Sequence, residues 1–132
     1  MGSPARTTPV PHQAAVKRVL VVEDDDDLRD SLVELVAGEG FQVESAKSGL
    51  EALDKLRWGL RPSLILLDLR MDVMTGWEFR NEQKRDPELA GIPVIAMTGG
   101  AWKMQDMDEF AACLFKPVSP EVLQRKLRLF CA

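Results

Sequence analysis

The chain has 132 residues, of which 45% are hydrophobic, and this length suits one domain with a single substantial core. Its formal net charge is −4, with no basic block and no stripe of interleaved aromatic and basic residues, so we expect no direct nucleic-acid ligand. Its uninterrupted apolar runs are far shorter than the roughly 20 residues that a transmembrane helix needs. The sequence therefore predicts a globular domain without a membrane span.

Residues 1–15 contain three prolines and no apolar periodicity, which predicts a flexible N-terminal tail followed by a folded domain over residues 16–132. The only histidine of the chain, His12, lies in this tail, so catalysis by histidine is not expected. The two cysteines, Cys113 and Cys131, show neither metal-ligand nor redox-motif spacing. We expect them to be free thiols of a cytoplasmic protein.

From Val16 onward, short apolar runs alternate with longer amphipathic stretches, as in βαβ units built on a parallel sheet. In chain order, the five expected strands are Arg18–Glu23, Phe41–Ser45, Ser63–Leu67, Ile92–Met97 and Ala112–Phe115. The third strand is apolar almost throughout, which is typical of a central strand that is covered on both faces.

The stretches between the strands contain helix signals. After the first strand, Leu28, Leu32 and Leu35 recur at helical spacing before Gly38. Three later helices are expected to begin at capping residues: Ser48 with Glu51, Thr75 with Glu78, and Ser119 before Pro120. A further helix, at about residues 101–110, is expected to be short because its pattern is weak.

Five consecutive acidic residues, Glu23–Asp27, directly follow the apolar run of the first strand. Each pair of like charges at contact distance is unfavourable by about 1 kcal/mol or more, so a divalent metal or a helix N-terminus is expected nearby. For Asp25–Asp27 we favour the first turn of a helix, where carboxylates lie at the positive end of the helix dipole. Glu23 and Asp24 leave the strand directly.

Polar residues also follow the other strands. Asp68 follows the third strand, Thr98 the fourth and Lys116 the fifth. Because ligands of open parallel sheets bind beyond the carboxyl ends of the strands, we expect these side chains to converge with Glu23 and Asp24 on one crevice. Three carboxylates and one ammonium group sum to about −2, a charge that Mg²⁺ can balance.

Such a set favours chemistry on a phosphoryl group. A carboxylate can attack phosphorus and form an aspartyl phosphate while a metal neutralises negative charge. Asp68 is the preferred nucleophile, because it alone leaves the most buried strand. The Thr98 hydroxyl and the Lys116 ammonium group are expected to bind the phosphoryl oxygens. Each residue alone has a plainer interpretation as a cap, a turn or a surface lysine, and only their joint placement favours a phosphoacceptor site.

Four spaced motifs resemble those of the receiver domain of two-component response regulators. They are VLVVED at residues 19–24, LILLDLRMDVMTG at 64–76, IPVIAMT at 92–98 and FKP at 115–117, within a resemblance that covers about residues 17–131. The resemblance implies a doubly wound (βα)₅ fold of the flavodoxin type, an α/β three-layer sandwich with parallel strand order 2-1-3-4-5. It also implies that Asp68 accepts a phosphoryl group from a histidine kinase or a histidine phosphotransfer protein.

The resemblance further assigns individual positions. Glu23 and Asp24 match the acidic pair that holds Mg²⁺, or Mn²⁺, together with Asp68 and the backbone carbonyl of Arg70. Lys116-Pro117 matches a junction whose peptide bond is commonly cis in this family. The reactions implied are metal-dependent self-phosphorylation and autodephosphorylation, so the chain is not expected to be an enzyme that turns over a substrate.

The chain departs from the family pattern close to Asp68. Asp72 stands where the family usually has a proline, and its carboxylate either strengthens metal binding or faces solvent. Arg70 either reaches over the pocket and pairs with phosphate or faces solvent. As a hypothesis, Arg70 alters the lifetime of the phosphorylated form.

A second departure lies between the fourth strand and Lys116. This interval is about four residues shorter than in typical receivers, or roughly one helical turn, which predicts a truncated fourth helix. Cys113 stands where the family usually has a tyrosine or phenylalanine that rotates inward on activation. The candidates for the switch are therefore Gly99 and Gly100, which give the loop freedom to move, together with Cys113 and Phe115.

The leading hypothesis is a phosphorylation-driven switch that acts on a downstream protein partner. The alternative is a receiver-like docking module that signals without phosphorylation, which the short fourth helix and Cys113 favour. The presence of Asp68, Thr98 and Lys116 opposes it. A third hypothesis, an aspartyl-phosphate hydrolase of small molecules, typically needs an acid two residues after the nucleophile, where this chain has Arg70.

Overall fold

The computed structural model describes residues 17–100 and 108–131. In chain order, the elements of these residues are β1 (Arg18–Val22), α2 (Asp26–Gly38), β2 (Gln42–Ala46), α3 (Gly49–Arg57), β3 (Leu64–Asp68), α4 (Gly76–Arg85), β4 (Val94–Thr98), β5 (Ala112–Phe115) and α6 (Pro120–Cys131). The predicted tail at 1–15 and most of the predicted helix at 101–110 lie outside the described residues. None of the helices within the described ranges is long and apolar enough to cross a membrane.

The five strands form one parallel sheet in the order β2-β1-β3-β4-β5, which confirms the predicted topology. Its register aligns Val22 with Leu67 and, one step further along the sheet, Asp68 with Met97. Thr98 in turn pairs with Phe115 at the end of β5. The carboxyl ends of the strands therefore lie level with one another at one edge of the sheet, where the candidate residues emerge.

Four of the five strands begin or end one or two residues away from the predicted bounds, and only Ala112–Phe115 is matched at both ends. The clearest difference is the fourth strand, predicted from Ile92 but observed from Val94. The N–H of Ile92 donates to the carbonyl of Leu89 in a turn, and Pro93 has no N–H to donate. Pro93 therefore takes part in the ladder only as an acceptor, through its carbonyl at 3.0 Å from the N–H of Ile65, and the strand itself begins at Val94.

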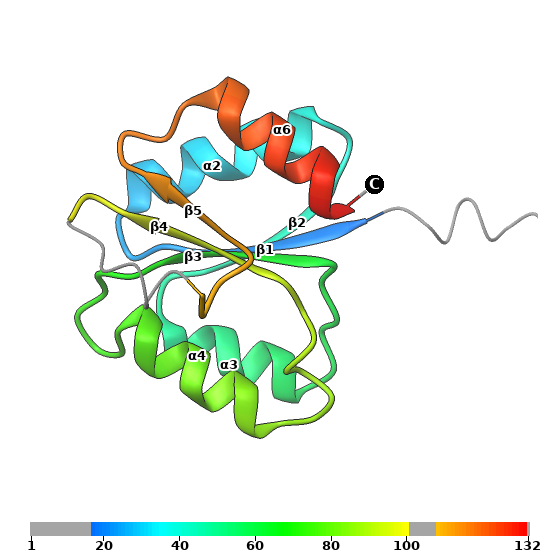
Figure 1. Ribbon diagram of the computed structural model, residues 1–132, viewed down its shortest axis with the longest axis vertical. Helices are drawn as coiled ribbons and strands as arrows, with labels where there is room; N and C mark the ends of the chain where they lie inside the picture. Colours follow the sequence, from blue (N-terminus) through cyan, green and yellow to red (C-terminus); the bar gives the residue numbers. More distant parts are fainter. Residues whose placement is uncertain (1–16, 101–107, 132) are drawn as a thin grey trace, which may run out of the picture.

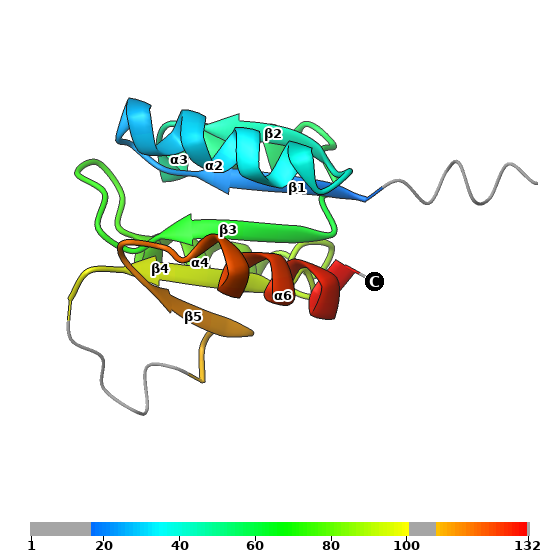
Figure 2. The same cartoon turned by 90° about the horizontal axis from the view of Figure 1, so that it is seen from above.

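Helices cover both faces of the sheet, with α2 and α6 on one side and α3 and α4 on the other (Figure 1). Figure 2 looks onto the layer of α2 and α6 and shows the strands behind it, side by side in the order β2, β1, β3, β4 and β5. Every side chain of β3 is buried, and successive residues alternate between two cores. Leu64 and Leu66 pack under α2 and α6, whereas Ile65 and Leu67 pack under α3 and α4. Burial of each such side chain contributes about 1.5–3 kcal/mol, which fixes β3 at the centre of the molecule.

The helix starts follow the capping pattern expected from the sequence. The Ser48 side chain accepts a hydrogen bond from the N–H of Glu51, and Thr75 forms a reciprocal capping box with Glu78. Asp25 caps α2 by accepting from the N–H of Leu28 at 2.9 Å. These caps fix where each helix leaves the loop that follows a strand, and so they fix the shape of the site-bearing edge.

Residues 108–111, which precede β5, form turns and bends rather than helix. The ring of Phe110 packs against that of Trp77 in α4, with centroids 5.1 Å apart. The carbonyl of Glu109 accepts from Nε of Arg80 at 2.9 Å, and its carboxylate pairs with Lys84 at 2.6 Å. This segment is thus fastened to α4 by one ring contact, one hydrogen bond and one ion pair.

Candidate functional site

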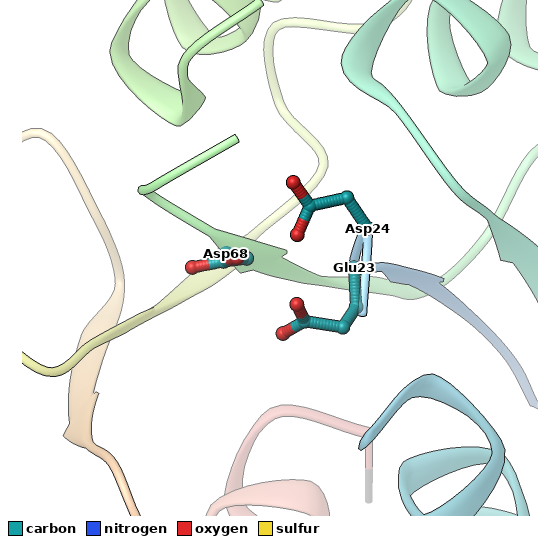
Figure 3. A group of neighbouring side chains, drawn as sticks. All are labelled: Glu23, Asp24 and Asp68. Atoms are coloured by element: carbon teal, nitrogen blue, oxygen red, sulfur yellow. The ribbon is translucent and has the colours of Figure 1, made fainter. Parts of the chain in front are cut away.

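Three carboxylates gather beyond the ends of two neighbouring strands. One oxygen each from Glu23, Asp24 and Asp68 lies within 4.8 Å of the others. Figure 3 shows Glu23 and Asp24 leaving the end of β1 with their carboxylates turned toward the side where β3 presents Asp68. Glu23 and Asp68 are 0% and 1% exposed, whereas Asp24 is exposed. The cluster therefore has two buried members and one that faces solvent.

The chain folds tightly around Glu23. The N–H of Asp25 donates to Oε2 of Glu23 at 3.2 Å while the Asp25 side chain caps α2. Arg29 in α2 donates from Nη1 to the backbone carbonyl of Glu23 at 3.0 Å. Sequence reasoning missed this role of Arg29, because helical spacing places an arginine on a face but does not tell which distant carbonyl it reaches.

Lys116 supplies the cation of the site. Its Nζ lies 3.1 Å from Oε1 of Glu23 and 3.3 Å from Oδ1 of Asp68. Partial burial by itself would lower the pKa of Lys116, but the adjacent Glu23 and Asp68 carboxylates outweigh burial and raise it overall. The N–H of Lys116 donates to the carbonyl of Thr98 at 2.8 Å, and the Lys116–Pro117 peptide bond is cis. The ammonium group is thus held between two buried carboxylates.

Burial raises the pKa of Glu23 to about 7, and the negative charge of Asp68 acts in the same direction. The hydrogen bond from the N–H of Asp25 and the proximity of Lys116 offset only part of this rise. Oε1 of Glu23 is buried without a hydrogen-bond partner, although Lys116 lies at ion-pair distance. A buried oxygen without a donor beside two further carboxylates is a donor set that fits an oxygen-loving divalent cation.

Thr98 ends β4 beside Asp68 and is 5% exposed. Its Oγ1 accepts a hydrogen bond from the N–H of Gly100 at 3.0 Å. Because the hydroxyl oxygen is the acceptor in that bond, its own hydrogen remains available for an anion. The structure therefore brings together five of the predicted site residues: Glu23, Asp24, Asp68, Thr98 and Lys116.

Arg70 lies at the same edge. Its N–H donates to Oδ1 of Asp68 at 3.1 Å, and the residue is exposed. An ideal Cβ placed on Gly100 would lie 3.2 Å from Nη2 of Arg70 and 3.6 Å from Oγ1 of Thr98. The guanidinium group thus belongs to an exposed residue and approaches the loop after β4, and its pairing with phosphate stays a prediction. Its backbone carbonyl, implied as a metal ligand, stays a prediction.

The predicted switch residues have unequal environments. Cys113 is partly buried against the core under α3 and α4, and burial raises the pKa of its thiol. Phe115, by contrast, is 57% exposed. Gly99 is exposed, and the nearest atom to an added Cβ would be Cβ of Lys116 at 4.0 Å. The aromatic side chain near the end of β5 is therefore on the surface, whereas the cysteine faces the interior.

Gly76, at the start of α4, is a second residue whose role the sequence did not reveal. A Cβ at this position would lie 2.6 Å from Cδ2 of Leu69 and 2.8 Å from the carbonyl oxygen of Asp68. The helix start is thus packed directly against the backbone that presents the Asp68 carboxylate. The only sequence signal for this contact is the glycine directly after the capping residue Thr75.

Comparison with known proteins agrees with this geometry. The profile of the response regulator receiver domain matches residues 19–128. The polar-differentiation response regulator DivK of Brucella anthropi is 39% identical over 87 residues, which cover 66% of this chain and 70% of DivK. The solved structure of the chemotaxis protein CheY4 of Vibrio cholerae is similar with a TM-score of 0.79 at 28% identity, over 87% of this chain and 98% of CheY4.

A second solved structure, the signal receiver domain of a histidine kinase from Syntrophus aciditrophicus, gives a TM-score of 0.78 at 28% identity. The similarity extends over 87% of this chain and 89% of the Syntrophus domain. The fold, the strand order and the acidic edge of the sheet are thus accompanied by a family match over most of the chain. This protein belongs to the family of response regulator receiver domains.

Proposed function

We propose that this protein accepts a phosphoryl group on Asp68 from a histidine kinase or a histidine phosphotransfer protein. An oxygen of the Asp68 carboxylate attacks phosphorus, and the bond between phosphorus and the imidazole nitrogen of the donor breaks. The imidazole leaves with the electron pair, and Asp68 becomes an acyl phosphate. Attack by water on the same phosphorus later releases inorganic phosphate and restores the carboxylate.

One observation carries this proposal: the buried Asp68 carboxylate lies 3.3 Å from the ammonium group of Lys116, within a cluster of three carboxylates. A phosphoryl group on Asp68 would place its oxygens between Lys116 and Thr98. The ammonium group of Lys116 and the free hydrogen of Thr98 can each bind one oxygen, and both bonds are strengthened by the negative charge of the acceptor. Lys116 thereby orients the phosphoryl group, and the hydrogen bond of Thr98 to this group forms only when Asp68 is phosphorylated.

The residues that would hold a divalent ion are Glu23, Asp24 and Asp68, with the carbonyl of Arg70. We propose Mg²⁺, or Mn²⁺, since both prefer oxygen ligands. When bound, such an ion neutralises negative charge on the phosphoryl oxygens during transfer. Glu23 would have to give up its proton to serve as a ligand, whereas Asp24 is the exposed member of the set.

We further propose that phosphorylation switches a surface for a downstream protein partner in the cytoplasm. Thr98 lies at the end of β4, and its Oγ1 already holds the N–H of Gly100 at 3.0 Å. Rotation of the hydroxyl toward a phosphoryl oxygen would change that bond and bias the loop that begins at Gly99. Within the described residues, Cys113 and Phe115 lie on the adjacent β5. We propose that their side chains transmit the change in the loop to the protein surface.

Phosphorylation itself is tested by incubating the protein with Mg²⁺ and a small acyl phosphate and following the intact mass. The wild type is expected to gain one phosphoryl group, and Asp68→Asn is expected to gain none. Asp72→Asn is the matched control, because Asp72 is a nearby exposed carboxylate outside the three-carboxylate cluster. It is expected to gain phosphate as the wild type does.

The other outcomes separate the remaining hypotheses. A wild type that gains no phosphate from either a small donor or a phosphorylated histidine protein contradicts the proposal and favours a docking module. Steady release of phosphate from varied phosphate esters, at a rate that exceeds loss of phosphate from the protein, would instead identify a hydrolase. A phosphate gain that persists in Asp68→Asn would place the acceptor elsewhere.

A further inference from the structure

The contact between Arg70 and Gly100 places a second cationic group at the edge of the site. Arg70 follows β3, and Gly100 follows β4, so the two residues approach each other from neighbouring strands. A Cβ on Gly100 would lie only 3.2 Å from Nη2 and 3.7 Å from Cζ of Arg70. Contacts of 3.2 Å to a Cβ are tighter than ordinary van der Waals contact. A side chain at position 100 would therefore push the guanidinium group away by a few tenths of an ångström.

Within residues 17–100 and 108–131, Arg70 takes part in none of the ion pairs, all of which join other residues. Its guanidinium group is permanently charged and presents a planar fork of N–H donors that matches phosphate geometry. The Cβ position of residue 100 lies 3.6 Å from Oγ1 of Thr98 and 3.2 Å from Nη2 of Arg70. A cation without an acidic partner therefore lies near a hydroxyl that is itself assigned to phosphoryl binding.

We infer that Arg70 is an additional binding residue for the phosphoryl group on Asp68, and that Gly100 makes room for it. This inference rests on the proposed function of Asp68. A phosphoryl group has three terminal oxygens, and Lys116 and Thr98 each serve one. Arg70 approaches from the solvent side, where it can donate to an oxygen that these two do not saturate. The backbone N–H of Arg70 already donates to Asp68, which anchors the residue beside the acceptor.

The inference assigns a specific consequence to Gly100. Gly100 does not have the left-handed backbone, since positive φ values occur only at Gly40 and Gly59 among the described glycines. Alanine is therefore compatible with its backbone, and the atom that it would meet is the far end of a flexible side chain. We expect Gly100→Ala to fold normally and to displace the guanidinium group of Arg70. The substitution then acts on phosphoryl binding only through Arg70.

The experiment measures the affinity for fluoroberyllate at saturating Mg²⁺. Its beryllium becomes tetrahedral when a carboxylate oxygen binds it, and its three fluorines then stand in for the phosphoryl oxygens. Because Arg70 is exposed, a hydrogen bond from its guanidinium group to the anion is weaker than a buried one, and Arg70→Ala is expected to weaken binding by about 10-fold. Gly100→Ala is expected to weaken it by several-fold, and to have no further effect in the Arg70→Ala background. Arg125→Ala, on the exposed surface of α6, and Gly91→Ala, whose Cβ would meet nothing within 4 Å, are the matched controls.

Binding of Mg²⁺ alone distinguishes phosphoryl binding by Arg70 from a merely structural role. A structural role would lower the affinity for Mg²⁺ as well. Arg70→Ala keeps the backbone carbonyl that is proposed as a metal ligand and removes only the side chain. Removal of a positive charge near the carboxylates cannot weaken cation binding electrostatically, so this variant should bind Mg²⁺ at least as tightly as the wild type. Loss of Mg²⁺ affinity in parallel with fluoroberyllate affinity would show a structural role and overturn the inference.

The two levels of the proposal fail in different ways. A wild type that is phosphorylated, with equal fluoroberyllate affinity in Arg70→Ala, overturns the role of Arg70 alone. Additive effects of Gly100→Ala and Arg70→Ala would likewise show that Gly100 does not act through Arg70. A wild type that neither gains phosphate nor binds fluoroberyllate overturns the function of Asp68 and this inference together.

Discussion

The ammonium group of Lys116 lies 3.1 Å from Oε1 of Glu23, although the two residues come from strands that are separated in the sheet by β3 and β4. Lys116 reaches across the carboxyl ends of these strands to the far side of the site. The positive charge of Lys116 partly compensates the negative charge of the Glu23 carboxylate, which is fully buried. A buried carboxyl beside another carboxylate makes the metal-free site sensitive to pH.

We predict that the metal-free protein loses stability as the pH rises through 7, and that Glu23→Gln loses less. Because the folded-state pKa of Glu23 is raised to about 7, the folded protein retains a proton that the unfolded chain has released above about pH 4.5. This contribution to stability is full below pH 4.5 and is lost as the pH rises through 7. Between pH 5 and pH 8, the wild type should lose on the order of 1–3 kcal/mol more than Glu23→Gln. Urea unfolding with a chelator present measures the difference, and parallel pH profiles would contradict it.

Stabilisation by Mg²⁺ should have the opposite pH dependence. Under the proposed ligand set, the carboxyl group of Glu23 must be deprotonated to coordinate the ion, so the increase in melting temperature at a fixed Mg²⁺ concentration should be larger at pH 8 than at pH 6. Ca²⁺ or Mn²⁺ can be compared in the same assay, and a univalent salt at equal ionic strength is the control. A shift that is equal at both pH values would show that Glu23 does not bind the ion through its carboxylate.

The acidic run Glu23–Asp27 should divide into two parts when its members are replaced. Asp25 caps α2 by accepting from Leu28, so Asp25→Ala should cost about 1 kcal/mol of stability in the metal-free protein. Asp24→Asn should leave that stability nearly unchanged, because Asp24 is exposed, but should weaken Mg²⁺ binding strongly. Calorimetric unfolding and Mg²⁺ titration of both variants provide the comparison. The division is wrong if Asp25→Ala loses the metal and Asp24→Asn retains it.

The fold and the core of the site could be predicted because they depend on local patterns and on one rule of topology. The apolar run that ends at Asp68 predicted a central strand, and β3 is buried along its whole length. Since parallel strands end level with one another, the polar residues after the first, third, fourth and fifth strands were enough to predict that Glu23, Thr98 and Lys116 would meet Asp68. No distance had to be known for that prediction.

Contacts between side chains of distant elements could not be predicted in the same way. The hydrogen bond from Arg29 to the carbonyl of Glu23 depends on how α2 packs against β1. The approach of Arg70 to Gly100 depends on the relative positions of two loops, and a sequence shows only that the arginine could reach inward or outward. The one-residue and two-residue errors in strand bounds have a similar origin, since they depend on which partner each N–H finds.

The segment before β5 should contribute measurably to stability through Phe110. Its ring is 7% exposed and contacts Trp77 of α4. Replacement by alanine removes the buried area and the ring contact, and should destabilise the protein by about 2–4 kcal/mol. Phe115→Ala is the matched control, because Phe115 is 57% exposed, and it should cost less than about 1 kcal/mol. Equal losses in urea unfolding would show that Phe110 does not fasten the segment to α4.

Gly76 should be the glycine of the described chain that is least tolerant of substitution. An added Cβ would lie 2.8 Å from both the carbonyl oxygen of Asp68 and Cα of Leu69, and neither backbone atom can move without shifting the loop after β3. Gly76→Ala is therefore expected to cost about 2–4 kcal/mol, although alanine is the better helix former. Gly38→Ala and Gly91→Ala, where an added Cβ meets nothing within 4 Å, should be close to neutral. Because one of the displaced atoms is the carbonyl oxygen of Asp68, the proposed phosphoacceptor, Gly76→Ala should also slow phosphate gain from a small acyl phosphate under conditions where the variant is still folded. A variant that keeps both wild-type stability and the wild-type rate would show that the loop yields without cost.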